Sequence, residues 1–507
     1  MNPVPDIFRI LPEVILTLTG VLVMLLDASL PPRWARRPLG WVAAFGTTFA
    51  LWASLWQISL PMGTGFSGTV ETSAFTVFFH VLICGLVLVA LLLSLDTLPE
   101  ESHHQGEFYA LIVFGAVGMC LLTGAVELLL VFIALEISSI ATYVLVGYRK
   151  NTARGPEAAI KYFLLGSFAT AFLLYGIALI FGATGTTEIY EIARLAPTAP
   201  NHSLILAGLG LMLVGILFKV SAAPFHVWTP DVYEGAPSPV VALISTAPKA
   251  AAFALLLRVV YEMLPTLRPV WSPLLWVVAV LSMTVGNLAA LRQTNVKRML
   301  AYSSIAHAGY LLAAFAGLGN DGIMAACFYI AAYAAMNVGV FAVVTLASGY
   351  DEKLPLIDDF RGLIYRSPLL GSLLIFFLAS LVGIPFTGGF FGKFISFSTA
   401  IGGGAIWLVI IGLLNSGLAA AYYLRLALAA AQRPEHDSNE KSAPPQVAQG
   451  ARVGIAVGAA LLLAVAATLV LGIIPGDVLR AAEAGAHTLQ APPAESGAPG
   501  NAVEPQP

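Results

Sequence analysis

The sequence predicts an all-α polytopic membrane protein, and two observations carry that prediction. Hydrophobic residues make up 58% of the 507 residues and charged residues only 10%, whereas a soluble domain carries about 25% charged residues. Apolar windows of about 20 residues, the length that crosses a bilayer as a helix, recur along the whole chain. Such continuous windows exclude a transmembrane β-barrel, and the net charge of −3 gives no indication of nucleic-acid binding.

These windows predict fourteen transmembrane spans, which short polar connections join. The N-terminal residues lack the basic region and the cleavage site of a signal peptide, so the first apolar stretch is expected to remain as a helix. The last thirty or so residues are rich in Pro, Ala and Gly without a period, which predicts disorder. The predicted spans lie at about 10–28, 40–60, 75–95, 108–123, 127–148, 158–181, 204–228, 239–262, 270–291, 299–317, 322–347, 368–400, 405–430 and 450–474.

Lys and Arg are distributed unequally between the two sides that these spans define. If the N-terminus lies outside and the spans alternate, fifteen Lys and Arg fall on the inner side. Only Arg9, Arg194, Arg268 and Arg480 fall on the outer side. Because Lys and Arg accumulate in cytoplasmic loops, the sequence predicts that both termini lie outside.

The chain also carries a weak internal repeat. Ser138-Ser139-Ile140-Ala141 recurs 165 residues later as Ser303-Ser304-Ile305-Ala306, and Arg258 has a counterpart 167 residues later in Arg425. These matches pair spans 4–8 with spans 9–13, and an odd number of spans inverts the second unit in the membrane. We predict an N-terminal three-helix segment at 1–100, a first five-helix repeat at 101–265, a second, inverted repeat at 266–431, a linker and the last transmembrane helix at 432–475, and a disordered tail at 476–507.

Helix breakers interrupt two of the predicted spans at matching places in the two repeats. Span seven contains Pro224, five residues after Lys219, and span twelve contains Pro385 with Gly388-Gly389, shortly before Lys393. Pro removes a backbone donor and clashes with the preceding turn. In lipid the freed backbone groups need other partners, so broken helices mark binding or transport sites. Spans seven and twelve are therefore predicted to be broken helices.

Five charged residues lie within predicted spans, where each charge costs about 2.5–3.5 kcal/mol on insertion scales. They are Glu136, Lys161, Lys219, Lys249 and Lys393. Residues of this kind usually line a polar path or bind a substrate. A Lys–Glu pair stabilises both charged forms, and gaining or losing the partner changes how firmly the lysine holds its proton. The set predicts a proton relay.

Some of the candidate relay residues allow both a functional and a structural interpretation. Lys161 begins span six near the inner surface, where its side chain can join the relay or simply extend to the interface. Lys393 lies in the outer half of span twelve, as an exit-side group would. His226 and His307 can pass protons through water, because the ordinary histidine pKa is near 6.5, or can be hydrogen-bonded interior histidines.

Several other polar residues are expected to be unremarkable in function. Asp231 and Glu234 follow span seven as solvated loop groups, and Arg258 and Arg425 lie toward span ends, where they can snorkel. Cys84, Cys120 and Cys327 lack the paired spacing of an iron–sulfur or zinc site and are read as packing residues. No metal site and no cofactor-binding site is predicted in this chain.

Three segments resemble the antiporter-like membrane subunits of respiratory complex I and the Mrp cation/proton antiporters. They are KVSAAPFHVWTPDVYEGAPSP at 219–239, followed by Pro248-Lys249, then LAYSSIAHAGY at 300–310 and GIPFTGGFFGKF at 383–394. ILPEVILTL at 10–18, EAAIKYFLLGSFATAFLLYG at 157–176 and a lysine at 393 further resemble the subunit N family of bacterial NADH–quinone oxidoreductases, the counterpart of mitochondrial subunit 2. The resemblance covers nearly the whole chain, apart from the tail and the linker at 432–448.

This resemblance implies a fourteen-span subunit with an inverted five-helix repeat. It also implies a proton path through a Glu on span five and lysines on spans seven, eight and twelve. These positions correspond to Glu136, Lys219, Lys249 and Lys393, with Lys161 on span six as a further member. Clustered Cys and a Gly-rich dinucleotide loop are both absent from the sequence. NADH, FMN, iron–sulfur clusters and quinone are therefore expected on other subunits.

The expected function is proton translocation by a non-redox subunit of NADH–quinone oxidoreductase, an enzyme complex. Such a chain would be an obligate hetero-oligomer with other membrane subunits, in the lipid bilayer of a bacterial inner membrane. One alternative is an Mrp-type sodium/proton antiporter subunit, although a sodium site needs oxygen ligands and this path is rich in lysine. The other alternative is a structural spacer between subunits, which would not need charges at bilayer depth.

Overall fold

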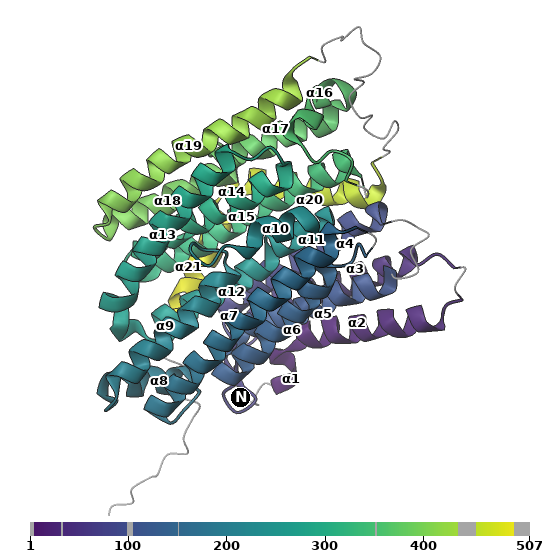
Figure 1. Ribbon diagram of the computed structural model, residues 1–507. Coiled ribbons are helices and arrows are strands. Elements are labelled where there is room, and N and C mark those ends of the chain that lie inside the picture. Colours follow the sequence, from purple (N-terminus) through teal and green to yellow (C-terminus); the bar gives the residue numbers. More distant parts are fainter. Residues whose placement is uncertain are drawn as a thin grey trace, which may run out of the picture.

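The protein is a bundle of long helices that run side by side (Figure 1). The computed structural model describes residues 5–31, 34–98, 105–150, 152–349, 352–433 and 453–490. Within these residues, thirteen helical segments are long and apolar enough to cross a membrane. The all-α polytopic class is thus confirmed. The count of fourteen stays a prediction, because the twelfth predicted span consists of two shorter helices.

The N-terminal segment contains three long helices and one small β-hairpin. Ser73 caps the third long helix by accepting a hydrogen bond from the Thr76 N–H at 3.3 Å. The strands pair antiparallel with Thr64 opposite Glu71, an element that the all-α prediction did not include. The bounds are α1 Asp6–Arg9, α2 Leu11–Ser29, α3 Arg37–Trp56, η1 Gln57–Ser59, β1 Gly63–Gly65, β2 Val70–Thr72 and α4 Ala74–Thr97.

The middle of the chain forms helices whose starts follow local capping rules. Glu127 accepts hydrogen bonds from the N–H groups of Leu129 and Leu130, at 3.0 and 2.8 Å, and so caps α6. The bounds are α5 Gln105–Gly124, α6 Leu128–Val146, α7 Arg154–Thr184, α8 Ile189–Leu195, η2 Ala196–Thr198, α9 His202–Lys219, α10 Trp228–Gly235, α11 Ser238–Ile244, α12 Ala247–Leu257, a π-helical turn η3 Arg258–Met263 and η4 Pro265–Leu267.

The remaining helices continue the side-by-side arrangement of the bundle. Asn295 caps α14 through the Arg298 N–H at 3.0 Å. The bounds are α13 Arg268–Leu291, α14 Val296–Ala313, η5 Ala314–Ala316, α15 Gly319–Ser348, η6 Ile357–Phe360, α16 Leu363–Arg366, α17 Pro368–Val382, α18 Gly388–Gly402, α19 Ile406–Ala431, α20 Ile455–Ile473 and α21 Gly476–Gln490.

The core is built around α11, α12 and α15. The spans Ser238–Met263 and Gly319–Ser348 are each 94% buried, whereas Leu11–Ser29 is only 33% buried and exposes an apolar face. In Figure 1, the N-terminal helices lie on one side of these central helices, while α13, α17 and α19 lie on the other. Polar groups on the central helices are therefore shielded from the apolar surroundings by the rest of the chain.

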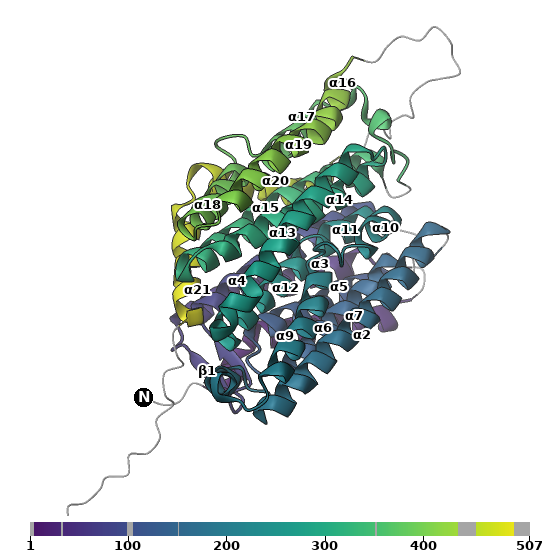
Figure 2. The same ribbon diagram turned by 60° about the vertical axis from the view of Figure 1, so that its left-hand side comes forward.

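The two ends of the bundle differ in chemistry. One end, the hairpin end, carries β1, β2, α8, η3 and α21; Figure 2 shows α21, in yellow, on the same side of the molecule as β1. The other, the basic end, carries ion pairs of basic residues with loop and helix-end carboxylates: Arg36–Asp27 at 2.7 Å, Arg149–Glu352 at 2.9 Å and Arg298–Asp231 at 2.7 Å.

The C-terminal prediction was wrong for its first part. Residues 476–490 form helix α21 instead of a disordered tail. Ala482, Ala486 and Leu489 recur at helical spacing on one face and are fully or almost fully buried. The Thr488 hydroxyl accepts a hydrogen bond from the Phe75 N–H of α4 at 3.2 Å, and His487 pairs with Asn320 of α15 at 2.8 Å. Residues 491–507 and most of the predicted linker at 432–448 lie outside the described residues.

The predicted breaks in spans seven and twelve are present. Helix α9 ends at Lys219, and the chain is not helical again until α10; α17 and α18 are separated by residues 383–387. Span eight is also interrupted, at Ser245 and Thr246 between α11 and α12. The inverted repeat stays a prediction, with Ser138–Ala141 on α6 and Ser303–Ala306 on α14.

Candidate functional site

The face of α6 that carries Glu136 lies against the end of α9, where Lys219 is located, without an ion pair between the two residues. Glu136, Ser139 and Tyr143 are spaced three and four residues apart, so they share one face of α6. Lys219 is the last residue of α9, where the helix dipole is favourable for a cation. Its Nζ donates to Ser139 Oγ at 2.7 Å and to Tyr143 Oη at 3.2 Å. Glu136 Oε1 is buried and has no hydrogen-bond partner among the described residues.

The backbone released by the break after α9 is satisfied by neighbouring side chains. The Ala223 N–H donates to Ser282 Oγ of α13 at 2.8 Å, and Trp228 Nε1 donates to the Phe218 carbonyl at 3.0 Å. Ser221 adopts a left-handed backbone with φ of 62°, which is uncommon for a residue other than Gly. These contacts stabilise the irregular segment that follows Lys219 in place of a further helical turn.

Lys249 lies in the first turn of α12, immediately after the break in span eight. It is 2% exposed. A helix N-terminus is unfavourable for a cation, so the ammonium needs acceptors. Ser304 of α14 supplies both its hydroxyl and its carbonyl, the latter at 3.2 Å. Tyr333 and Tyr233 also bond to Ser304 Oγ, at 2.7 and 3.2 Å.

His307 is a fully bonded interior group on the same face of α14 as Ser304. It follows Ser304 by three residues, the spacing that places side chains on one face. Its Nδ1 lies 3.0 Å from Tyr329 Oη, and its Nε2 lies 3.2 Å from Tyr423 Oη. Tyr310 follows at the same spacing and receives a hydrogen bond from Asn287 Nδ2 at 3.0 Å. Helix α14 therefore presents a polar stripe between Lys249 and Lys393.

Lys393 lies on α18, and its side chain reaches back across the break to the end of α17. Its Nζ donates to the carbonyls of Leu381 and Val382, at 3.1 and 2.9 Å, and to Ser416 Oγ at 2.9 Å. The two carbonyls belong to the C-terminal end of α17, which favours a cation. The ammonium also lies 5.0 Å from the centre of the Tyr310 ring. Lys393 thus joins the α14 stripe.

The break in span twelve depends on close packing at Gly389. A Cβ added there would lie 1.9 Å from the Ser380 carbonyl oxygen and 2.7 Å from Met336 Sδ. We expect Gly389→Ala to destabilise the protein by about 1–3 kcal/mol, because overpacking forces backbone shifts. The midpoint of thermal unfolding of the purified complex measures this loss. Gly402→Ala, on the same helix with open space around the added Cβ, is the control; equal midpoints for the two variants would contradict the expectation.

Aromatic rings separate the Lys219 group from the Lys249 group. Tyr162 stacks on Trp228 at 4.4 Å between ring centres, and the Lys219 ammonium lies 5.7 Å from the Tyr162 ring. Trp228 in turn contacts Tyr233 at 6.5 Å, and Tyr233 reaches Ser304. The structure therefore brings Lys219, Lys249, His307 and Lys393 onto one internal line.

Lys161 belongs to a different environment, at the basic end. Its side chain is 44% exposed and pairs with Glu157 at 2.8 Å and with Asp231 at 2.9 Å. An open cavity of about 180 Å³ lies beside these groups. Asp231 and Glu234 are not the simple solvated loop groups that the sequence suggested, because Arg298 bonds both, at 2.7 and 3.0 Å. Burial alone would raise the pKa of Asp231, but Lys161 and Arg298 hold it below its usual value.

His226 is not brought onto the internal line. It is half-buried in the irregular segment before α10, and its Nδ1 has no hydrogen-bond partner within the described part of the chain. Its neighbours Pro224 and Val227 are exposed on the surface of the bundle. The structure gives His226 no contact with the relay lysines that would distinguish it from a packing residue.

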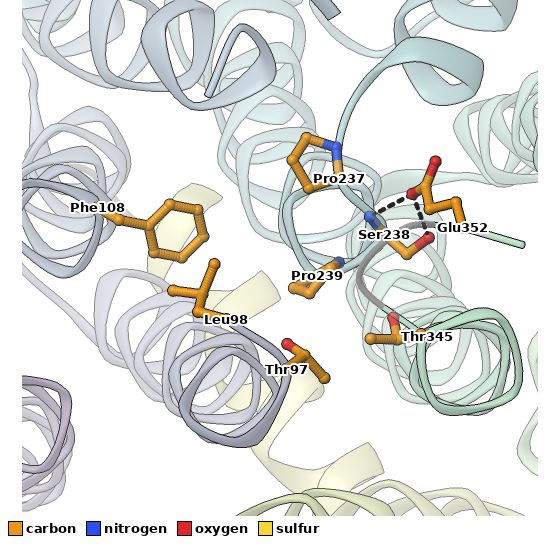
Figure 3. Close-up of a pocket in the computed structure, with 9 residues that line it drawn as sticks. Thr97, Leu98, Phe108, Pro237, Ser238, Pro239, Thr345 and Glu352 are labelled. Atoms are coloured by element: carbon orange, nitrogen blue, oxygen red, sulfur yellow. Dashed lines mark hydrogen bonds between the residues drawn. The ribbon is translucent and has the colours of Figure 1, made fainter. Parts of the chain in front are cut away.

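A second feature of the basic end is the Glu352 carboxylate. Figure 3 shows Ser238 bonding it through both N–H and hydroxyl, at 3.0 and 2.8 Å. Lys297 and Arg149 also contact it, at 2.7 and 2.9 Å. The adjoining cavity is about 10 Å³, room for about one water molecule. Glu352 thus anchors the start of α11 and is not part of a ligand pocket.

Two buried charged clusters escaped the sequence analysis. Arg258 is 1% exposed and pairs with Glu71 and Glu262, so it does not snorkel. Glu13 and His80 pair at 3.3 Å inside the N-terminal segment. Only the Arg258–Glu262 pair could have been recognised in the sequence, because residues four apart are neighbours on the surface of a helix.

The comparisons with known proteins agree with this geometry. Residues 125–419, more than half of the chain, match the family model described as NADH:quinone oxidoreductase/Mrp antiporter, TM. NADH-quinone oxidoreductase subunit N 2 of Koribacter versatilis is 49% identical over 442 residues, covering 86% of this chain and 89% of that relative. Subunit N of Trichlorobacter lovleyi is 45% identical over 421 residues, covering 82% and 86%.

Solved structures show the same fold. A chain of respiratory complex I from Thermus thermophilus with bound aureothin matches with a TM-score of 0.77 and 37% identity, covering 94% of this chain and 100% of that chain. A chain of the Mrp complex from Dietzia matches with a TM-score of 0.80 at 20% identity, covering 96% and 98%, and shares the fold alone. Fold and buried lysines thus define an antiporter-like membrane subunit. The chain belongs to the subunit N family of NADH–quinone oxidoreductases.

Proposed function

We propose that this chain translocates protons within an NADH–quinone oxidoreductase, using Glu136, Lys219, Lys249 and Lys393 as relay groups. The observation that supports this most is the setting of the three lysines. Lys219, Lys249 and Lys393 contact hydroxyl and carbonyl oxygens, whereas Lys161 and Lys297 are held in ion pairs with carboxylates. An amine without a paired carboxylate can lose its proton without leaving a bare buried anion behind.

Electron transfer to quinone elsewhere in the complex would drive the relay. NADH, FMN, iron–sulfur clusters and quinone would then bind other subunits, and this chain would contribute only proton transfer. The relatives named subunit N belong to such complexes by name, so the partners of this chain are other membrane subunits in an obligate hetero-oligomer. His307 lies between Lys249 and Lys393, because its ring packs against Tyr333, which bonds Ser304 beside Lys249, and against Tyr310, whose ring faces the Lys393 ammonium. Lys161 serves at the basic end.

The distribution of charge gives the orientation. The basic end carries Arg36, Arg149, Lys297 and Arg298, and Lys and Arg accumulate on the cytoplasmic side of membrane proteins. We infer that the basic end faces the cytoplasm of a bacterial cell. Both termini then lie on the outer side of the inner membrane, at the hairpin end.

The test is proton translocation coupled to NADH oxidation by the whole complex in proteoliposomes. Lys219→Ala and Glu136→Gln are each expected to lower the number of protons moved per NADH, because each removes a group that holds a proton near the middle of the path. Ile140→Ala, which alters an exposed position on the same helix as Glu136, is expected to pump normally.

Two results would overturn the proposal. One is a normal proton-to-NADH ratio in both Lys219→Ala and Glu136→Gln. The other is sodium-dependent proton transport by the isolated chain in liposomes, which would identify a sodium/proton antiporter.

A further inference from the structure

A buried cluster of three charges lies at the hairpin end, apart from the lysine relay. Arg258 Nη2 contacts Glu71 Oε2 at 3.0 Å, and Arg258 Nη1 contacts Glu262 Oε2 at 2.5 Å. The side chains are 1%, 11% and 4% exposed for Arg258, Glu71 and Glu262. The cluster joins β2 of the N-terminal segment to the π-helical turn at the end of span eight.

The charges of this cluster do not balance. One guanidinium, whose charge is permanent, faces two carboxylates, which leaves one negative charge in excess if both are ionised. The other groups around the guanidinium are uncharged: the Thr123 carbonyl at 3.2 Å and the Phe75 ring at 5.5 Å. The phenol of Tyr190 on α8 also lies near both carboxylates.

Charged groups on the surrounding elements make other contacts within the described part of the chain. Arg9 on α1 donates to the Pro61 and Gly63 carbonyls of the hairpin, at 3.4 and 2.7 Å. Arg194 on α8 is exposed and pairs with Glu191 at 2.6 Å. Arg480 on α21 is exposed and pairs with Asp477, and His487 is 62% exposed. Arg268 donates to the Gly317 carbonyl at 3.0 Å. A buried charge without a partner is costly, and two close carboxylates avoid that cost by sharing one proton.

One carboxylate oxygen in the cluster is free to carry that proton. Glu262 Oε1 is buried and makes no hydrogen bond to any described residue, and Glu262 as a whole is 7% exposed. Glu262 Oε2 is the atom that holds Arg258. A proton on Oε1 would remove the excess charge without breaking the contact with the guanidinium.

The cluster lies between the interior of the bundle and its hairpin end. Lys249 precedes Arg258 by nine residues in the same span, roughly 13 Å along a helix axis. The turn carrying Arg258 and Glu262 is π-helical, and the Leu264 N–H bonds the Val259 carbonyl at 3.0 Å; π turns are frequent at functional sites. Glu71 has the most exposed side chain of the three, at 11%, and lies on β2, the buried strand of the hairpin.

We propose that Arg258, Glu71 and Glu262 form a proton-holding site, in which the two carboxylates share one proton. An arriving proton converts a carboxylate into a carboxylic acid and brings the cluster to zero net charge; a departing proton leaves through Glu71 to the hairpin end. The inference of a shared proton depends on the geometry of the cluster alone. The role of the cluster as the release group rests on the proposed function.

Infrared spectroscopy of the assembled complex tests the shared proton. Difference spectra across a pH titration report the C=O stretch of protonated carboxylic acids. Glu71→Gln and Glu262→Gln are each expected to lose one titrating carboxylic acid per complex, because either change leaves one carboxylate paired with one guanidinium. Glu191→Gln removes an exposed, already balanced carboxylate on α8 and is expected to leave this signal unchanged.

Each Gln variant is decisive alone, so failure of one to assemble leaves the test intact. A wild-type carboxylic acid signal in an assembled Glu71→Gln or Glu262→Gln complex would overturn the shared proton. The release role has its own measurement, the appearance of protons on the outer side after NADH addition. Proton appearance is expected to be delayed in both Gln variants. Wild-type timing in both would overturn the release role but would leave the infrared result unaffected. Neither outcome depends on the result for Lys219→Ala.

Discussion

Replacing Lys249 by Met is expected to slow proton transfer through this chain by about 10²–10⁴-fold, the usual contribution of a positioned acid–base group. Met retains the length and the apolar stem but lacks the amine, so the proton path is interrupted between Lys219 and His307. Lys249 is 2% exposed and held by Ser304. No other ammonium on the path contacts that serine among the described residues. The complex should continue to oxidise NADH while moving fewer protons per NADH.

The measurement is the proton-to-NADH ratio of the complex in proteoliposomes. Leu255→Met places the same side chain six residues further along the same helix, at a position 1% exposed, and a Leu-to-Met change usually costs little. This control should translocate protons as the wild type does. An unchanged ratio in Lys249→Met would remove Lys249 from the path and leave Lys219 and Lys393 without a described connection.

Replacing Arg258 by Met is expected to destabilise the protein by about 3–5 kcal/mol, the usual result of removing one partner from a buried ion pair. Glu71 and Glu262 would lose their cation while remaining buried. The loss should appear as less assembled complex in the membrane and a lower midpoint of thermal unfolding. Adding Glu71→Gln and Glu262→Gln to Arg258→Met should recover part of that loss, because neutral side chains need no counter-ion.

Arg425, the counterpart of Arg258 in the predicted repeat, supplies the control. It is exposed and donates to the Leu291 carbonyl at 3.0 Å, so Arg425→Met should change stability little. Equal stability of Arg258→Met and the wild type would mean that the two carboxylates do not depend on the guanidinium.

Much of the fold could be predicted because apolar length and helix breakers are local signals. The window at 10–28 became α2 Leu11–Ser29, and the window at 322–347 became α15 Gly319–Ser348. Pro385 and Gly388-Gly389 indicated the break in span twelve. Pro lacks the backbone N–H that a helix needs, and Gly allows the chain to turn tightly.

The break in span eight was missed although a signal was present. Ser245 and Thr246 are not strong helix breakers, and both hydroxyls bond backward to the Ala242 carbonyl, at 3.2 and 2.7 Å. Pro248, near the start of α12, favours the first turn of a new helix. This combination places Lys249 at a helix N-terminus, a setting that explains why Ser304 supplies two acceptors.

The buried clusters could not be predicted from a single sequence. Glu71 and Arg258 are 187 residues apart, and no sequence pattern near either residue indicates their contact. The helix at 476–490 was concealed by its Ala-rich composition, which resembles a disordered tail. Its buried face consists mostly of small residues, so the apolar period at Ala482, Ala486 and Leu489 is weak by sequence and clear only by burial.

Helix α21 has a consequence for the order in which the molecule is completed. It touches α4, near the beginning of the chain, through Phe75 and Thr488, and α15, in the later half, through Asn320 and His487. It is also translated after every other described element, and domains form from the N-terminus during synthesis. The contacts of α21 with α4 and α15 are therefore the last to form at the hairpin end. A ribosome that stops before α21 leaves a bundle without this link, in which contacts such as Tyr261 with Phe315 and Arg268 with Gly317 still join the two halves at that end.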